Sequence, residues 1–382
     1  MIEQYILQMP QKVYSGKDAL KNIKAITQGK QEIAIFTDKG IAEAGLLDYV
    51  LKYLEDKEVL LFDELPTEPN CDEVQSIIDK VKKSKFQMIL AVGGGSVMDI
   101  AKLVSVLLKS EYTVRNLLED NSLMKKGIET LMIPTTAGTG SEATPNSIVT
   151  VPENNLKVGI VGTQMIADYV ILDAIMIKKL PLKIAAATGV DAMAHAIECI
   201  TSKKSNPFSD LFAFEAMDLI INNIVNACKD PSAMDAKNAM LLAAFYGGVA
   251  ITASGTTAVH ALSYPLGGKY HIPHGISNAM MLIPVMKFNE PACKDRFAKV
   301  YDRVNRNKLH HISEEEKSQW VINKMEEIVN NLEIPTSLSA YGIGKEDLSE
   351  LVASGMKVTR LLVNNMREVK EEDARDLYLQ IM

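Results

Sequence analysis

Residues 86–110 of the chain read FQMILAVGGGSVMDIAKLVSVLLKS. The apolar run MILAV is typical of a buried strand, and the residues after Ser96 place apolar side chains at helical spacing. Between the two, Gly93, Gly94 and Gly95 let the backbone approach a pyrophosphate closely, and a helix that begins near Ser96 directs unpaired N–H groups at it. A flexible Gly/Ser linker would have neither flank. This stretch therefore predicts a strand, a phosphate-binding loop and a helix, in that order.

Short β-rich runs alternate with helical patterns around this stretch. The runs EIAIFTD and EVLLFDEL predict strands, and residues 39–55 and 71–83 predict the helices that follow them. TLMIPTT, SIVTV, LKVGIVG and YVILD predict further strands, some of which could form a hairpin layer. Strands and helices that alternate at this spacing favour a parallel sheet covered by helices. We predict a Rossmann-like, dinucleotide-binding α/β domain over residues 1–181.

The pattern becomes helical throughout after Pro181. Apolar residues recur at helical spacing in segments 184–201, 206–228, 233–253, 275–289, 313–331, 346–363 and 371–381. Almost no β-rich run lies between these segments. We therefore predict an all-helical, metal-binding second domain over residues 182–382.

One acid and three histidines in this helical half have the composition of a metal site. Asp191 and His195 are four residues apart in a predicted helix, so both side chains leave the same face. His260 is expected near the end of the next long apolar helix, and His274, within the sequence PHG, at a tight turn. Singly, each of these residues is more often structural than a ligand. Together, one carboxylate and three imidazoles suit a divalent iron or zinc ion.

Composition narrows the classes of partner and compartment. The chain has 382 residues, 47% of them hydrophobic, and a formal net charge of −7. A negative balance argues against nucleic acid or an anionic membrane as a partner, since both select basic surfaces. The four cysteines show no paired spacing and predict reduced thiols. We find neither a signal-peptide pattern nor an apolar run long enough to span a membrane, and so expect a cytoplasmic protein.

These motifs resemble those of the iron-containing (group III) alcohol dehydrogenases, which have the dehydroquinate-synthase-like fold. Residues 189–198, GVDAMAHAIE, match the family's metal-binding helix G-x-D-A-x-x-H-A-I-E. Residues 260–275 match its second metal segment, and residues 93–102 match its motif G-G-G-S-x-x-D-x-A-K. The resemblance implies four metal ligands: Asp191, His195, His260 and His274. It assigns Glu198 no catalytic or ligand role: this residue is expected either on the helix surface or behind the ligands as a support.

The resemblance also implies a dinucleotide site in the first domain. The loop IPTTAGTGSE, residues 133–142, offers hydroxyl groups to a phosphate or ribose. An acid at the end of a strand, as Asp38 is, can bind an adenosine ribose and repel a 2′-phosphate, so NAD is expected over NADP. Asp38 could also, or instead, cap the helix that begins at Lys39. The residues expected to bind the cofactor are Asp38, Asn70, Gly93, Gly94, Gly95, Ser96, Thr135, Thr136, Thr139 and Lys157.

The reaction implied is reversible hydride transfer between nicotinamide and a small primary alcohol or aldehyde bound to Fe(II), or to Zn(II). Many family members carry a histidine four residues after the third ligand, where this chain has Tyr264. Tyr264 could relay a proton or only line the pocket, and the additional His271 could be a relay, a spare metal ligand or a surface residue. Asn146 aligns with a substrate-pocket position. Ile251 and Met366 also depart from the family pattern, and they concern substrate identity rather than reaction class.

Other proteins of this fold remain open alternatives: a glycerol dehydrogenase, a hydroxyacid–oxoacid transhydrogenase, or a lyase that uses NAD only transiently. A lyase acting on sugar phosphates would need several cations near the metal, where the sequence offers chiefly Lys269. A catalytically silent binding subunit would not need both the ligand set and the glycine loop. The resemblance further implies a homodimer, for which the strand around Lys12–Tyr14 could pair at a sheet edge.

Overall fold

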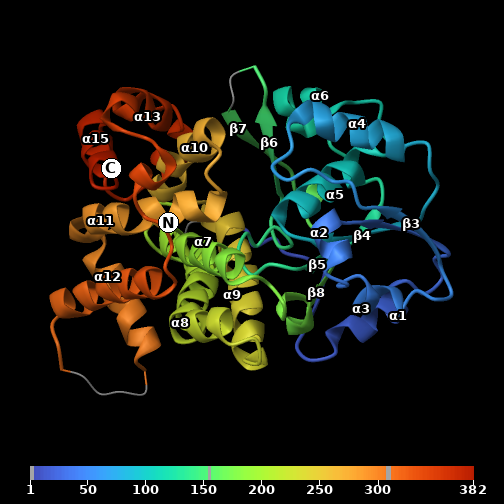
Figure 1. Cartoon of the computed structure of the whole chain (residues 1–382), viewed down its shortest axis with the longest axis horizontal. Coiled ribbons are helices and arrows are strands. Elements are labelled where there is room, and N and C mark those ends of the chain that lie inside the picture. The colour runs from blue at the N-terminus through green and yellow to red at the C-terminus, as the bar shows by residue number, and fades with distance from the viewer. Residues whose placement is uncertain (1–3, 154–155, 307–310) are drawn as a thin grey trace. The chain divides into compact units, whose positions relative to one another are not determined.

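The computed structural model describes residues 4–153, 156–306 and 311–382 of the chain. Contacts divide these residues into two compact units, which Figure 1 shows coloured along the chain. The first, called here the α/β unit, comprises Gln8–Leu180. The second, the helical unit, comprises Pro181–Met382 together with the start of the chain up to Leu7.

A six-stranded parallel sheet forms the centre of the α/β unit (Figure 1). The strands lie in the order β1-β8-β5-β4-β2-β3, and all neighbours pair in parallel. Their bounds are Lys12–Ser15 (β1), Glu32–Phe36 (β2), Glu58–Phe62 (β3), Met88–Gly93 (β4), Glu129–Pro134 (β5) and Tyr169–Leu172 (β8). β6 (Asn146–Val151) and β7 (Leu156–Val161) form a separate antiparallel hairpin. The predicted parallel sheet and the predicted hairpin are both confirmed.

Alternating strand residues separate the two faces of this sheet. On one face, Ile33 and Ile35 of β2 and Leu90 of β4 join a buried cluster with residues of the short helices α1 (Ile23–Ile26) and α3 (Asp48–Leu51). On the other face, α5 (Gly95–Leu107) packs against β4, β5 and β2, and α4 (Cys71–Val81) packs against α5. Because α5 is apolar nearly all round, it is almost entirely buried.

The predicted helix over residues 39–55 is two short helices instead. α2 (Lys39–Glu43) ends before Gly45, whose φ of 70° lies in the left-handed region, and α3 begins at Asp48. A glycine adopts that conformation without steric cost, so it interrupts a segment whose apolar spacing would otherwise continue.

Every regular element that the structure describes after Pro181 is helical, as predicted. The longer helices are α7 (Leu182–Ile200), α8 (Pro207–Lys229), α9 (Met234–Ser254), α10 (Ala258–Tyr270), α11 (His274–Val304), α12 (Glu314–Asn331), α13 (Leu348–Met356) and α15 (Glu371–Leu379), and α14 (Thr359–Leu362) is a single turn. α7, α8 and α9 pack on one another, and α11 packs on α7, α10 and α12. This packing places the N-terminal turns of α10 and α11 against α7.

The prediction for His260 was wrong. The preceding helix ends at Ser254, and Gly255, with φ of 75°, turns the chain. His260 is instead in the first turn of α10, a helix that the sequence analysis did not predict. Its interior Pro265 and paired glycines obscure the helical pattern.

The tight turn expected at His274 is the beginning of a helix. Pro273 stands at the N-cap position, and His274 is the first residue of α11. A proline fits this position because its fixed φ leads into the helix and its missing N–H has no intrahelical partner there. His274 is therefore held by a long helix rather than by an isolated loop.

The expectation that no segment reaches membrane-spanning length was also wrong. α8 and α9 have the length and apolar composition to cross a membrane. Their most apolar windows are 44% and 61% buried, and the two helices pack against each other and against α7. Core helices of soluble proteins pass the same test, so this composition is weak evidence for a membrane.

Candidate active site

Four donor side chains of the helical unit meet at one point. α7 carries Asp191 and His195 one turn apart, α10 carries His260, and α11 begins with His274. The first three are buried, at 2%, 6% and 3% exposure. Oδ1 of Asp191 lies 3.8, 3.7 and 3.6 Å from Nε2 of His195, His260 and His274, respectively. The fold thus brings together all four residues that the sequence proposes as ligands.

This spacing fits a divalent metal ion. Bonds of about 2.0–2.2 Å in a tetrahedral site place donor atoms roughly 3.4 Å apart. The distances from Asp191 are close to that separation, and Nε2 of His260 lies 2.9 Å from Nε2 of His195. The donor atoms of these three residues all lie within 4.8 Å of one another. One carboxylate with imidazoles is a set that iron and zinc both accept.

Glu198 supports His260 from behind. Its side chain is fully buried, at 0% exposure, three residues after His195 on α7. One carboxylate oxygen contacts Nδ1 of His260, and the other accepts hydrogen bonds from the N–H groups of Thr257 and Val259. A carboxylate at Nδ1 keeps the proton there and leaves the Nε2 lone pair for a metal. The helix-surface alternative for Glu198 is therefore wrong.

Asn278, one turn after His274 on α11, is a residue that the sequence analysis missed. Its Nδ2 lies 2.7 Å from Oδ1 of Asp191, 3.1 Å from Nε2 of His260 and 3.2 Å from Nε2 of His274. The hydroxyl of Ser263 donates to its Oδ1, which turns the amide N–H groups toward Asp191. The side chain is fully buried. Asn278 therefore fixes the orientation of the Asp191 carboxylate.

The buried charges of this site shift one another's pKa values. Burial raises the pKa of the Asp191 carboxyl, but the facing histidines outweigh burial and hold it well below its usual range. Burial lowers the pKa of His260, and the carboxylates of Glu198 and Asp191 together raise it to about 9. In the metal-free protein His260 is therefore protonated on both ring nitrogens, and a metal ion must displace the proton on Nε2.

The two candidates for proton relay lie in different surroundings. The ring of Tyr264, one turn after His260, has its centroid 6.5 Å from that of His260 and 6.2 Å from that of His274. Burial raises the pKa of the Tyr264 phenol, and Arg360 beside the hydroxyl acts in the opposite direction. His271 is exposed and ends α10 with φ of 55°. No hydrogen bond or ion pair joins His271 to the donor set within the described residues.

Eight of the ten predicted cofactor residues, all except Asn70 and Lys157, lie at the carboxyl ends of three neighbouring strands of the α/β unit. Gly93 ends β4 and Gly94–Ser96 follow it, Asp38 follows β2, and Thr135–Thr139 follow β5. The direction in which the chain adds strands reverses between β2 and β4, because β3 lies beyond β2 and β5 beyond β4. Open parallel sheets bind ligands at such a switch point.

The glycine loop shows two different reasons for glycine. A Cβ on Gly93 would lie 2.6 Å from Cγ2 of Val97, and one on Gly95 would lie 2.9 Å from Cγ2 of Thr139. Neither position accepts a side chain without movement. A Cβ on Gly94, the N-cap residue of α5, would meet nothing closer than 3.6 Å. No side chain caps α5, so its first N–H groups are available to an anion.

Thr135 gives an independent sign of a ligand in this loop. The residue is 1% exposed, and its hydroxyl has no hydrogen-bond partner. A buried hydroxyl left unpaired costs about 1–3 kcal/mol, so such atoms normally meet a water or a ligand. The neighbouring Thr139 hydroxyl accepts a hydrogen bond from the N–H of Ser141. The loop therefore fits a bound dinucleotide through Thr135 and the start of α5.

Asp38 and Asn70 both act as helix N-caps. Oδ1 of Asp38 accepts a hydrogen bond from the N–H of Ile41 at 3.0 Å, which confirms the capping alternative. Asn70 forms a capping box with Glu73 at the start of α4. The second carboxylate oxygen of Asp38 has no hydrogen-bond partner among the described residues, so capping does not exclude a ligand.

Glu68 links two other predicted cofactor residues. Its N–H donates to the hydroxyl of Ser96 at 3.2 Å, and its carboxylate pairs with Lys157 at 3.0 Å. The backbone of Glu68 has φ of 50°, in the left-handed region. Glu68 thus ties β7 to the start of α5, a role that no local sequence pattern indicates.

A buried lysine holds the loop between β5 and β6 in place. Lys102 is 0% exposed, and its Nζ donates to the hydroxyls of Ser141 and Thr144 and to the main-chain oxygen of Asn146. Asp99 lies 3.4 Å from the same Nζ. The motif residues Asp99 and Lys102 therefore position the loop. The side-chain amide of Asn146 makes no hydrogen bond among the described residues.

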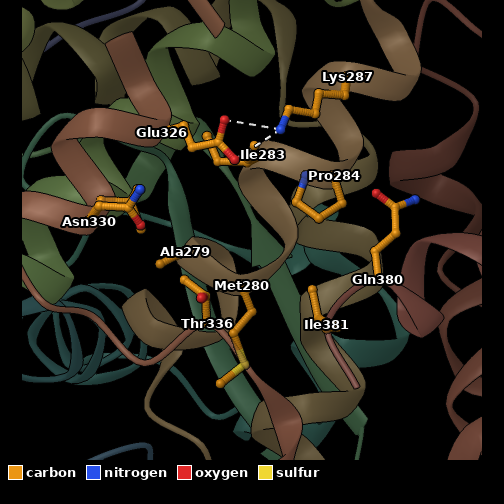
Figure 2. A pocket seen from close by; sticks show the side chains of 11 residues that line it. Ala279, Met280, Ile283, Pro284, Lys287, Glu326, Asn330, Thr336, Gln380 and Ile381 are labelled. Carbon is orange, nitrogen blue, oxygen red and sulfur yellow. Dashed lines mark hydrogen bonds and ion pairs between the residues drawn. The ribbon is translucent and has the colours of Figure 1, made fainter. Parts of the chain in front are cut away.

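A separate cavity of about 200 Å³ lies in the helical unit (Figure 2). Ala279, Met280 and Ile283 of α11 line one side, and Lys287 of the same helix pairs at 2.9 Å with Glu326 of α12 on the other side. None of the four metal-donor residues lines this cavity. It is therefore not part of the candidate active site.

Comparison with known proteins covers both units. A family model described as iron-containing alcohol dehydrogenase matches residues 10–174, and one described as the C-terminal part of the Fe-containing alcohol dehydrogenase family matches residues 185–382. The chain belongs to the iron-containing alcohol dehydrogenase family. It is accordingly an oxidoreductase of the alcohol dehydrogenase class, and the resemblance inferred from the motifs is confirmed.

Individual relatives of this family member extend over most of the chain. Long-chain-alcohol dehydrogenase 1 of Geobacillus thermodenitrificans is 33% identical over 355 residues, which are 92% of this chain and 89% of the relative. A 4-hydroxybutyrate dehydrogenase of Clostridium kluyveri is 32% identical over 317 residues, 82% and 84% of the two chains. The crystal structure of a 1,3-propanediol oxidoreductase matches with a TM-score of 0.93 at 26% identity over the whole of both chains. The dehydroquinate-synthase-like fold is thereby confirmed.

Proposed function

We propose that this protein is a metal-dependent alcohol dehydrogenase and aldehyde reductase that uses NAD(H). The observation that carries the proposal is the donor set of Asp191, His195, His260 and His274, with Glu198 held against His260. Fe(II) is the proposed metal and Zn(II) the alternative, since the donors suit both. A substrate oxygen would be a fifth ligand beside the four protein ligands, as in catalytic sites that expand to five-coordinate geometry.

The chain's own residues prepare this site for its reaction. A divalent ion at these donors would polarise a carbonyl and lower the pKa of an alcohol. Glu198 keeps the proton of His260 at Nδ1, and Asn278 orients Asp191. Tyr264 is the favoured relay because its ring lies beside the rings of His260 and His274. His271 is the second candidate and, being exposed, would exchange protons through solvent.

The dinucleotide supplies or accepts the hydride, and the α/β unit is proposed to bind it. The N–H groups at the start of α5 and the unpaired Thr135 hydroxyl suit the phosphates. The free carboxylate oxygen of Asp38 suits a ribose diol, which favours NAD over NADP. The proposed binding residues are Asp38, Asn70, Gly93, Gly94, Gly95, Ser96, Thr135, Thr136, Thr139 and Lys157.

The proposed substrate is a small primary alcohol or its aldehyde. The relatives named above act, by their names, on long-chain alcohols and on 4-hydroxybutyrate, so the reaction is shared and the substrate is not. Asn146, whose side-chain amide has no other partner among the described residues, is proposed to contact a substrate hydroxyl.

We further propose a cytoplasmic homodimer without a nucleic-acid or membrane partner. β1 pairs only with β8 among the described strands, so its outer edge can accept a second strand. Pairing of two such edges between copies would satisfy the backbone groups there. Light scattering of the purified protein at micromolar concentration tests the dimer, and a mass of one chain would contradict it.

The test of the reaction follows NADH oxidation by protein reloaded anaerobically with Fe(II), over a panel of small aldehydes. Turnover should disappear with a chelator and in His274→Ala, and it should survive in His311→Ala, a matched exposed histidine. If the protein binds both metal and NADH but no aldehyde of the panel supports NADH oxidation, the proposal fails. Turnover that requires an added keto acid, without net NADH loss, would indicate a transhydrogenase instead.

A further inference from the structure

One cation lies beside the candidate metal site without a carboxylate to neutralise it. Arg360 is on α14, which packs against α10, the helix of His260 and Tyr264. Its positive charge opposes the burial that raises the pKa of the Tyr264 phenol, so the guanidinium lies near that hydroxyl. Since the Tyr264 ring stands 6.5 and 6.2 Å from the rings of His260 and His274, Arg360 is one side chain removed from the ligands.

Three other arginines of the helical unit are neutralised by carboxylates, whereas Arg360 is not neutralised by any described residue. Arg296, Arg303 and Arg306 each form an ion pair with a carboxylate of α8. Arg360 forms no ion pair with any residue that the structure describes, and it is exposed. A guanidinium carries five donors and binds carboxylate, sulfonate or phosphate groups through two of them at once.

We propose that Arg360 binds an anionic group at the far end of the substrate, so that the preferred substrates are short aldehydes or alcohols carrying a carboxylate or a related oxyanion. This inference rests on the proposed function. The aldehyde carbon accepts hydride from NADH and its oxygen takes a proton, while the anionic group keeps its charge throughout and only orients the molecule. Binding energy from a group remote from the reaction can be used to position the reacting end.

The experiment compares 5-oxopentanoate with its neutral methyl ester as substrates of the metal-loaded protein. The wild-type protein should favour the carboxylate in kcat/KM by roughly 10- to 100-fold, as expected for a charged hydrogen bond. Arg360→Gln should bring that ratio close to one, mainly through KM of the carboxylate, and Arg360→Lys should retain part of it. Aldehydes ending in a sulfonate or a phosphate show which oxyanion fits best.

Two controls separate charge recognition from a structural role. Arg375→Gln removes an exposed arginine from α15 of the same unit and should leave the ratio unchanged. Tyr264→Phe keeps the ring but removes the hydroxyl, and the carboxylate preference should persist because the guanidinium charge remains. An equal fall for both substrates in Arg360→Gln would overturn the inference, as would a wild-type ratio near one. The absence of turnover with every aldehyde would instead contradict the proposed function itself.

Discussion

The carboxylate of Glu198 on α7 contacts Nδ1 of His260 at the start of α10. The same carboxylate accepts hydrogen bonds from the N–H groups of Thr257, Val259 and His260, which α10 leaves without intrahelical partners. A negative charge at a helix N-terminus is also favoured by the helix dipole. One side chain therefore caps α10 and fixes the tautomer of a metal ligand.

Glu198→Gln should weaken metal binding by roughly 10- to 100-fold, the usual effect of losing a carboxylate behind a ligand histidine. The amide oxygen can still accept the backbone hydrogen bonds, so the fold should persist while His260 loses its charged partner. Competition for Zn(II) against a chromogenic chelator measures the affinity. Glu327→Gln, at an exposed ion pair, is the matched control and should bind as the wild type. Equal affinities for the two variants would contradict this role of Glu198.

Asn278→Ala should lower metal affinity several-fold, because the Asp191 carboxylate loses the donor that orients it. Ser263→Ala should have a smaller effect in the same direction, since Ser263 only holds the Asn278 amide. The chelator competition serves here too, together with circular dichroism to show that the helices are intact. A larger effect from Ser263→Ala than from Asn278→Ala would contradict this order of support.

Glu142→Gln should stabilise the protein at alkaline pH. Burial raises the pKa of the Glu142 carboxyl from 4.5 to about 7. Because the unfolded chain loses this proton more readily, the stability of the native protein falls as pH rises from 4.5 to 7 and stays lower above 7. The substitution should raise the free energy of unfolding by about 1–3 kcal/mol at pH 8 and change it little at pH 5. Urea unfolding at both pH values measures this, with the exposed Glu111→Gln as control.

Gly94→Ala should weaken NADH binding by roughly tenfold or more without lowering the melting temperature. The protein alone has room for the added methyl group. A pyrophosphate bound at the start of α5 would need the same space. Gly95→Ala should lower both the NADH affinity and the melting temperature, since its Cβ would meet Thr139 at 2.9 Å. Fluorescence titration of NADH and thermal unfolding make the two measurements. Unchanged NADH affinity in Gly94→Ala would place the dinucleotide elsewhere.

The sequence predicted the architecture well and the local geometry around the ligands less well. Alternation of apolar residues is set by whether a segment is strand or helix, so the parallel sheet and the helical second half were readable from it. α10 was not, because Pro265 and its glycines lower the helical signal although neighbouring helices hold the segment in place. The long helix predicted over residues 39–55 failed at Gly45, where backbone conformation rather than apolar spacing decides.

The candidate site divides in the same way. The ligand types and the glycine loop were determined by residue identity, since only certain side chains bind a metal and only glycine accepts the loop's packing. Helical spacing was a usable signal for the two supporting residues, because Glu198 shares a face with Asp191 and Asn278 shares one with His274. Spacing alone does not say which faces meet.

What the sequence by itself determined is therefore the set of chemical groups and the local element that carries each. Tertiary structure alone decided that Glu198 reaches His260, 62 positions away, and that Asn278 reaches Asp191, 87 positions away. It also decided that Arg360 stands beside Tyr264. The physical reason is that periodicity follows from the geometry of one helix or strand, whereas contacts between distant segments depend on how the whole core packs.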